Sequence, residues 1–231
     1  MKIEKYFENI NNESQNVFSE SKQRQNELGT LHHLSSCIHE FSSSILDRDE
    51  RTVLEAVSIQ LESANFSLTL GLYRQAFSSL RLALELGLAA IYFSAHRIEL
   101  NEWLDGRLDI KWSVLTDREN GVLSKRFSQA FFKELTDEIE HYRGQSTSVY
   151  RKLSEYVHGN SETWEKGIKL AYDAEIFDTY LDYYKSSVEV ILFACVCRYT
   201  TSLEESSRES MQFVTEELGH LEEIRKAFGR S

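Results

Sequence analysis

An arginine and a histidine stand seven residues apart in a segment whose other residues predict a helix. Seven residues make almost two turns of an α-helix, so Arg151 and His158 leave the same face, offset by about 20° and about 10 Å apart along the axis. An imidazole can move a proton near neutral pH, and a guanidinium matches two phosphoryl oxygens. This pair could therefore bind a phosphodiester and carry out acid–base chemistry on it.

The same spacing also arises on an ordinary amphipathic helix. Arg151 could then be a surface residue paired with Glu155 at i+4, which stabilises a helix by only a few tenths of a kcal/mol. His158 could bond a free carbonyl group at the end of the helix, beside Gly159. A catalytic and a structural interpretation both remain open for the pair.

Two further charged residues are four apart in the most apolar predicted helix. Charges are rarely buried without a partner, so Arg81 and Glu85 have two interpretations. They form a structural ion pair, or Glu85 orients Arg151 or His158 while Arg81 contributes to substrate binding.

Three polar residues flank the pair along the chain. Tyr150 and Ser154 precede His158 by two turns and one turn, and each could bond a phosphate oxygen or serve only in helix packing. Asn160 could contact substrate or cap the end of the helix.

His32, His33, Cys37, His39 and Glu40 form a cluster of residue types that can bind a metal ion. Only His33 and Cys37 have the spacing that lets two ligands on one helix bind the same ion. No second ligand pair matches it, so we expect a solvated helix face there, no metal and no cofactor.

Apolar residues at spacings of three and four predict a chain of helices. Residues 1–28 are polar and predict a loosely packed helix or arm, and residues 99–122 predict short helices and turns. Residues 47–49 predict an N-terminal helix cap, and Gly71 predicts a turn. Residues 144–147 predict a break in the helix, after which a serine or threonine caps the helix that carries Arg151 and His158. The main helices are predicted over 30–46, 50–70, 72–98, 124–142, 173–200 and 205–228.

Composition agrees with an all-α multi-helix bundle. The 231 residues contain no Pro and only ten Gly, which favours long helices over a turn-rich β fold. We expect a helical extension over 1–48, a bundle over 49–200 and an amphipathic helix over 201–231, packed on the bundle or on a partner. The net charge of −11 argues against duplex binding and against anionic membranes.

The three cysteines indicate a reducing compartment. Cys37, Cys195 and Cys197 are odd in number, and the last two lie in an apolar run, so they read as reduced core residues of a cytoplasmic protein. The start of the chain has no apolar signal region. The longest apolar stretches are too short or too interrupted to span a bilayer.

The helical bundle, the Arg81 and Glu85 helix and the later Arg151–His158 pair with six intervening residues resemble the HEPN superfamily. The resemblance implies a helical bundle that dimerises so that two Arg–His motifs meet at the two-fold axis. It also implies a metal-independent ribonuclease of a toxin–antitoxin or antiviral defence system. Lys152 and Asn160 depart from residues that members often carry after the Arg and the His.

The resemblance therefore predicts a homodimeric endoribonuclease with RNA as its substrate. His158 would carry the proton, Arg151 would bind the phosphoryl group, and Glu85 would hold one of them in place. Many members of the superfamily lack activity, so the alternative is a non-catalytic adaptor or regulatory subunit of an antiviral defence complex. A protein partner or an antitoxin could also bind the chain.

Overall fold

Helices account for all regular secondary structure in the computed structural model, which describes residues 2–158 and 170–229. The long helices are α1 (Ile3–Ser21), α2 (Gln25–Ser43), α3 (Arg48–Thr69), α4 (Tyr73–Ala95), α8 (Ile139–His158) and α10 (Ala174–Tyr199). The short elements are α5 (Arg97–Leu104), α6 (Trp112–Leu115), α7 (Lys125–Phe131), the 3-10 turn η1 (Lys133–Leu135), α11 (Glu205–Ser210), α12 (Gln212–Leu218) and α13 (Glu222–Phe228). The all-α prediction is confirmed.

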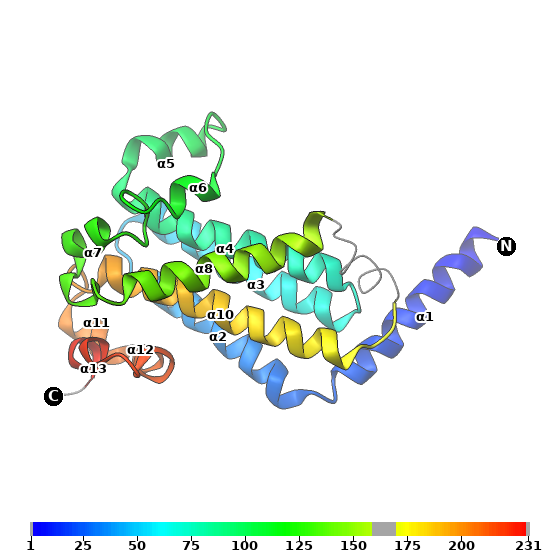
Figure 1. Ribbon diagram of the computed structural model, residues 1–231. Helices are drawn as coiled ribbons and strands as arrows, with labels where there is room; N and C mark the ends of the chain where they lie inside the picture. Colours follow the sequence, from blue (N-terminus) through cyan, green and yellow to red (C-terminus); the bar gives the residue numbers. More distant parts are fainter. Residues whose placement is uncertain (1, 159–169, 230–231) are drawn as a thin grey trace.

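Five long helices, α2, α3, α4, α8 and α10, pack lengthwise into a bundle (Figure 1). The short helices gather at one end of it, and α1 extends from the other end. Helices α4 and α10 are buried on several sides, as the apolar residues all around them require. Helix α4 is also long and apolar enough to cross a membrane, but 61% of its most apolar window is buried inside the bundle.

A buried polar network fixes the relative positions of α2, α3 and α10. The Tyr180 hydroxyl donates to Asn65 Oδ1 at 3.1 Å, and Asn65 Nδ2 donates to the Tyr184 hydroxyl at 3.1 Å. Tyr184 in turn donates to the carbonyl oxygen of Leu31 at 3.0 Å. Because each member has a partner, the bundle avoids the cost of unpaired polar groups in its interior.

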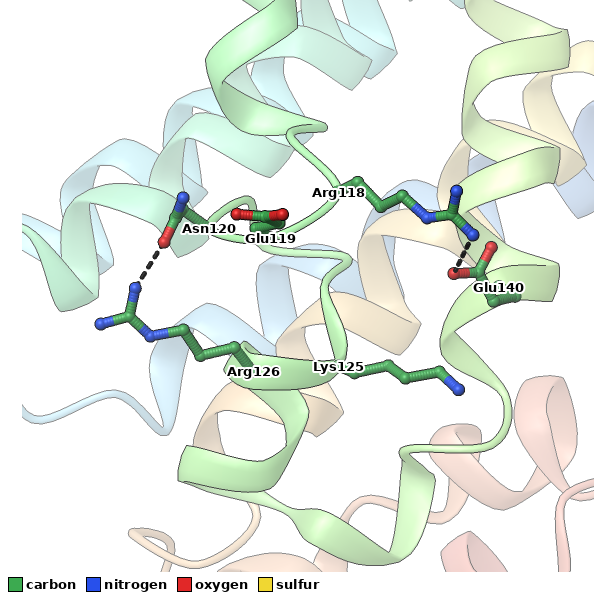
Figure 2. A pocket seen from close by; sticks show the side chains of 6 residues that line it. All are labelled: Arg118, Glu119, Asn120, Lys125, Arg126 and Glu140. Atoms are coloured by element: carbon green, nitrogen blue, oxygen red, sulfur yellow. Dashed lines mark hydrogen bonds and ion pairs between the residues drawn. The ribbon is translucent and has the colours of Figure 1, made fainter.

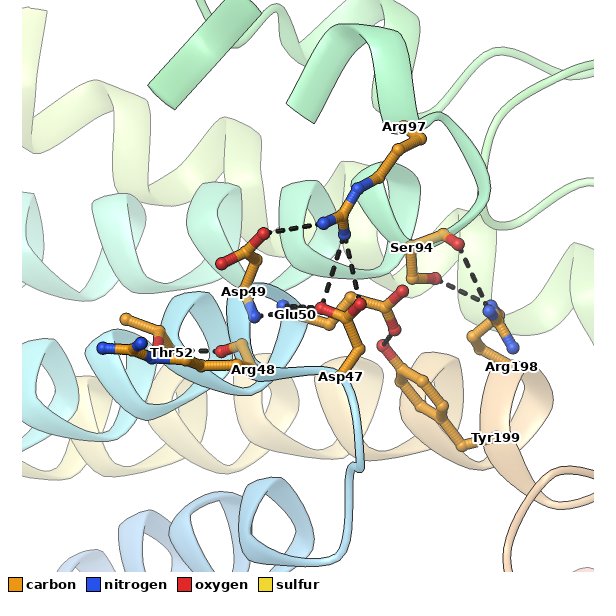
Figure 3. Close-up of polar contacts among 9 residues, drawn as sticks. All are labelled: Asp47, Arg48, Asp49, Glu50, Thr52, Ser94, Arg97, Arg198 and Tyr199. Atoms are coloured by element: carbon orange, nitrogen blue, oxygen red, sulfur yellow. Dashed lines mark hydrogen bonds and ion pairs between the residues drawn. The ribbon is translucent and has the colours of Figure 1, made fainter. Parts of the chain in front are cut away.

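The predicted cap and turn around α3 are both present. Asp47 accepts hydrogen bonds from the backbone N–H groups of Asp49 and Glu50, at 2.9 and 3.0 Å. Arg97, at the start of α5, pairs with Asp47 and Asp49, and Tyr199 donates to Glu50 at 2.8 Å (Figure 3). The turn from α3 to α4 places Gly71 at φ +77°, a conformation that favours glycine.

A second set of contacts joins the end of α4 to α10 and α7. Arg198 donates from Nε to the Ser94 hydroxyl at 2.7 Å and from Nη2 to the Ser94 carbonyl at 3.2 Å (Figure 3). Its guanidinium also lies over the ring of Phe131, 4.4 Å from the centroid. These contacts fix the walls of a concavity described below.

The prediction of one helix over 124–142 and a break over 144–147 is wrong. Helix α7 ends at Phe131, because Phe132 turns its backbone out of the helical region and its carbonyl accepts a bond from the Ser128 hydroxyl. Helix α8 then runs without interruption through Gly144. Ser146 and Thr147 bond the Arg143 carbonyl one turn back and cap nothing.

The single helix predicted over 205–228 is also wrong, because three short helices occupy this range. Met211 and Leu221 lie at the two breaks and are both buried. The predicted apolar stripe does face the interior, but the chain bends to bury these two residues. Helical spacing alone cannot distinguish a straight helix from a bent one whose apolar residues keep the same face.

Candidate functional site

Arg151 and His158 lie on the outward face of α8. The buried residues of this part of the helix are Val149, Leu153 and Tyr156, and an α-helical turn places Arg151 and His158 on the opposite side. Both side chains are exposed. The predicted common face is therefore present and open to solvent, with the two residues about 10 Å apart along the axis.

No neighbouring element encloses the pair within the described residues. Neither side chain makes a hydrogen bond or an ion pair there, and the main concavities of the described chain are lined by other residues. Among the described residues, one copy of the chain thus presents a guanidinium and an imidazole without a shared partner. Their separation of about 10 Å makes convergence on one phosphate easier when a second surface contributes.

Three other predicted residues do come together, between α4 and α8. Arg81 Nη2 donates to Glu85 Oε1 at 3.2 Å and to the Tyr150 hydroxyl at 2.5 Å, and Tyr150 donates to Glu85 Oε1 at 2.9 Å. The Arg81 guanidinium also lies 4.6 Å from the centre of the Tyr150 ring. The ion-pair interpretation of Arg81 and Glu85 is confirmed.

This cluster holds Tyr150 neutral and fixed. Burial raises the pKa of Tyr150 above its ordinary value, and the bonded Glu85 carboxylate acts in the same direction. Trp112 stacks flat on the Tyr150 ring, with centroids 3.8 Å apart and planes 3° from parallel. The contact of Trp112 with Tyr150 was not predicted, because nothing in the sequence relates Trp112 to a residue 38 positions later. Glu85 bonds Arg81 and Tyr150, and among the described residues of one chain it makes no hydrogen bond or ion pair with Arg151 or His158.

The remaining predicted residues add little to the pair. The Ser154 hydroxyl donates to the Tyr150 carbonyl at 2.7 Å, within its own helix, so its hydrogen is already used. Asn160 and the predicted helix end at Gly159 lie outside the described residues. Within the described ranges, no group of three or more His, Cys, Asp or Glu could hold a metal ion. His33 lies against Cys37 and Glu217, at 3.5 and 3.2 Å.

Comparison with known proteins gives no assignment for this chain. No family model matches it, and neither does any curated protein or any solved structure. The resemblance to HEPN domains therefore rests on the all-α bundle and the Arg151–His158 spacing alone, and the fold stands as an all-helical protein without an identified family.

Proposed function

We propose that the protein is a metal-independent endoribonuclease whose site is completed by a second copy of the chain. The observation that carries the proposal is the joint exposure of Arg151 and His158 on one face of α8. A guanidinium can bind a phosphoryl group and stabilise the charge of its transition state, and an imidazole can move the proton of a ribose hydroxyl.

A two-fold arrangement supplies the convergence that one chain lacks. If two α8 helices meet in antiparallel orientation about an axis midway between Arg151 and His158, Arg151 of one copy faces His158 of the partner subunit. A two-fold interface of this kind is isologous and creates two equivalent sites. In each, His158 would take the proton of the 2′-hydroxyl as that oxygen attacks the adjacent phosphorus. The bond from phosphorus to the 5′-oxygen of the next nucleotide would break, His158 would return the proton to this oxygen, and a 2′,3′-cyclic phosphate would remain. A cytoplasmic defence or toxin–antitoxin role follows from the resemblance.

The test is RNA cleavage by the purified chain in the presence of EDTA. Arg151→Ala and His158→Ala should each abolish cleavage while leaving helicity and oligomeric state intact. Lys152→Ala is the matched control, since Lys152 is exposed beside Arg151 but lies over the ring of Tyr183, 5.3 Å from its centroid. Cleavage retained in either the Arg151 or the His158 variant would refute the mechanism.

Mixing the two inactive variants tests the shared site directly. In a random mixture half of the dimers are mixed, and each holds one intact site of two, so roughly a quarter of wild-type activity should return. No recovery after subunit exchange would show that Arg151 and His158 do not act across a two-fold interface.

A non-catalytic interaction module is the second candidate function. Two observations favour it: among the described residues of one chain Glu85 is bonded to Arg81 and Tyr150 and to neither proposed catalytic residue, and the chain carries 37 acidic against 26 basic residues. A wild-type chain that dimerises, leaves RNA intact and co-purifies with the product of a neighbouring gene would establish this function over the first.

A further inference from the structure

Basic residues are concentrated in one part of this acidic chain. Residues 111–152 carry eight Lys and Arg against six Asp and Glu, although acidic residues predominate in the whole sequence. Arg118, Lys125 and Arg126 line a concavity of about 720 Å³ where the loop after α6 meets the starts of α7 and α8 (Figure 2). Glu119 and Glu140 line it too, so the cations exceed the carboxylates by one. A local excess of positive charge in a concave surface favours an anionic ligand.

The loop that carries Arg118 and leads into Lys125 and Arg126 at the start of α7 is held in place by its own hydrogen bonds. Asp117 Oδ1 accepts from the N–H groups of Glu119 and Asn120, at 3.1 and 2.7 Å. The Val122 N–H donates to the Leu115 carbonyl at 3.0 Å. A Cβ on Gly121 would lie 2.5 Å from that carbonyl oxygen, so the loop is closed as tightly as a glycine permits. Because these contacts fix the backbone of the loop, less conformational entropy is lost when a ligand binds to it.

Two of the cations can turn to a ligand at little cost. Glu140 is hydrogen-bonded to Arg143, which is the main cause of its lowered pKa. Arg118 approaches Glu140 only to 3.7 Å and is 75% exposed. Lys125 extends toward the same side of the concavity (Figure 2) and makes no hydrogen bond or ion pair among the described residues. Arg118 and Lys125 thus provide two adjacent donors for an anion.

A second concavity of about 360 Å³ adjoins the first and shares Asn120 and Arg126 with it. It is largely aromatic, and its walls include Tyr92, His96 and Phe131. Tyr92 and His96 stack with centroids 3.9 Å apart, and Phe131 is backed by Arg198. Aromatic faces of this kind stack on nucleobases.

Polar groups at the second concavity suit the edge of a base. The Glu99 carboxylate lines it and can accept from N–H groups. His96 Nδ1 lies 2.9 Å from the Tyr92 carbonyl and so must donate, which leaves Nε2 as an acceptor in the neutral ring. Asn120 lines both concavities, so a sugar would lie beside it, and its side-chain amide is held there by Arg126 and Asp117.

We propose that the two concavities together bind a nucleotide, with its base between the aromatic walls and its phosphate on Arg118 and Lys125. The ligand is either a free nucleotide or one nucleotide unit of a single-stranded RNA, since both present the same base and phosphate. This site is separate from Arg151 and His158 and does not depend on the proposed nuclease activity.

The experiment is a binding titration of the full chain with the four 5′-nucleoside monophosphates and with pyrophosphate. A single-stranded oligoribonucleotide of about eight nucleotides is titrated against the full-length His158→Ala variant, so that it is not cleaved during the measurement. Binding of monophosphates indicates a free nucleotide as ligand, and binding of the oligoribonucleotide alone indicates a unit of RNA. Arg118→Ala combined with Lys125→Ala should weaken both nucleotide and pyrophosphate binding about tenfold or more. Lys185→Ala, which removes an exposed charge on α10, is the matched control.

The base site is tested by filling it. Ala130 lines the aromatic concavity and is exposed, so Ala130→Trp should block the base without disturbing the core. This variant should weaken nucleotide binding but leave pyrophosphate binding unchanged. The proposal is overturned if neither the monophosphates nor the oligoribonucleotide binds, or if the Lys185→Ala variant weakens binding as much as the double variant. Arg151→Ala and His158→Ala should bind nucleotides normally, so failure of the nuclease proposal is distinguishable from failure of this one.

Discussion

Replacing Gly87 by alanine should destabilise the bundle, although alanine is the better helix former. Gly87 lies in the interior of α4, where α10 packs directly against it. A Cβ at this position would lie 2.7 Å from Ile191 Cγ1, 2.8 Å from Cδ1 and 3.1 Å from Cγ2. Real Cβ atoms essentially never approach another carbon this closely, so the Ile191 side chain or one of the two helices must shift.

The magnitude follows from two opposing terms. Alanine in place of glycine stabilises a helix interior by about 0.8–1 kcal/mol. Overpacking a filled core costs about 1–3 kcal/mol. Ile191 is fully buried, and a β-branched side chain in a helix has one strongly preferred χ1 rotamer, so it adjusts only at a cost. We therefore expect Gly87→Ala to lower the free energy of unfolding by about 1 kcal/mol.

Gly144 provides a matched control in α8. It is also in a helix interior, but nothing lies within 4 Å of the position of its Cβ. Gly144→Ala should therefore raise the free energy of unfolding by the whole difference in helix propensity between glycine and alanine, about 1 kcal/mol. The two glycine-to-alanine substitutions should differ by about 2 kcal/mol, with opposite signs.

Urea unfolding followed by far-UV circular dichroism measures both effects, and a double-mutant cycle with Ile191→Ala isolates their cause. Ile191→Ala alone should cost about 2–5 kcal/mol through the cavity it leaves. In that background the clash is gone, so Gly87→Ala should become stabilising. The reasoning is refuted if Gly87→Ala stabilises the wild-type chain as Gly144→Ala does, or if it stays destabilising without Ile191.

Two further predictions concern ionisable groups. Asp47→Ala should cost about 1 kcal/mol at neutral pH, because the α3 cap is lost. The Glu50 N–H group and Arg97 hold the pKa of Asp47 below its usual 3.8, so the carboxylate stabilises the fold above that pH. The difference from wild type in unfolding free energy should therefore shrink as the pH falls below this value, and a difference that grows would contradict the assignment. Burial raises the pKa of Cys37 and Cys197 to about 12, and that of Cys195 further. A thiol reagent should label none of them in the native protein at mildly alkaline pH and all three after unfolding, and rapid native labelling would show that the core opens.

The amino-acid sequence was sufficient to predict most of the long helices. Apolar spacing placed α2, α3, α4 and α10 within a few residues of their ends, because a helix buried in a bundle needs an apolar stripe and little else. Asp47 and Gly71 were predictable for a similar reason: a side-chain cap and a left-handed turn each depend on one local residue type. The pairing of Arg81 with Glu85 also followed from their spacing in one helix.

Only the tertiary structure decided what distant segments do to one another. Helix α8 passes through Gly144 because the buried stripe from Tyr142 to Leu153 packs against the bundle, which outweighs the weak helical preference of glycine. Glu85 meets Tyr150 because α4 and α8 pack side by side, and the sequence alone gives no sign of this contact. The cationic and aromatic concavities adjoin for the same reason: their walls come from α4, α5, α7 and the loop before α7, whose meeting depends on packing and not on local spacing.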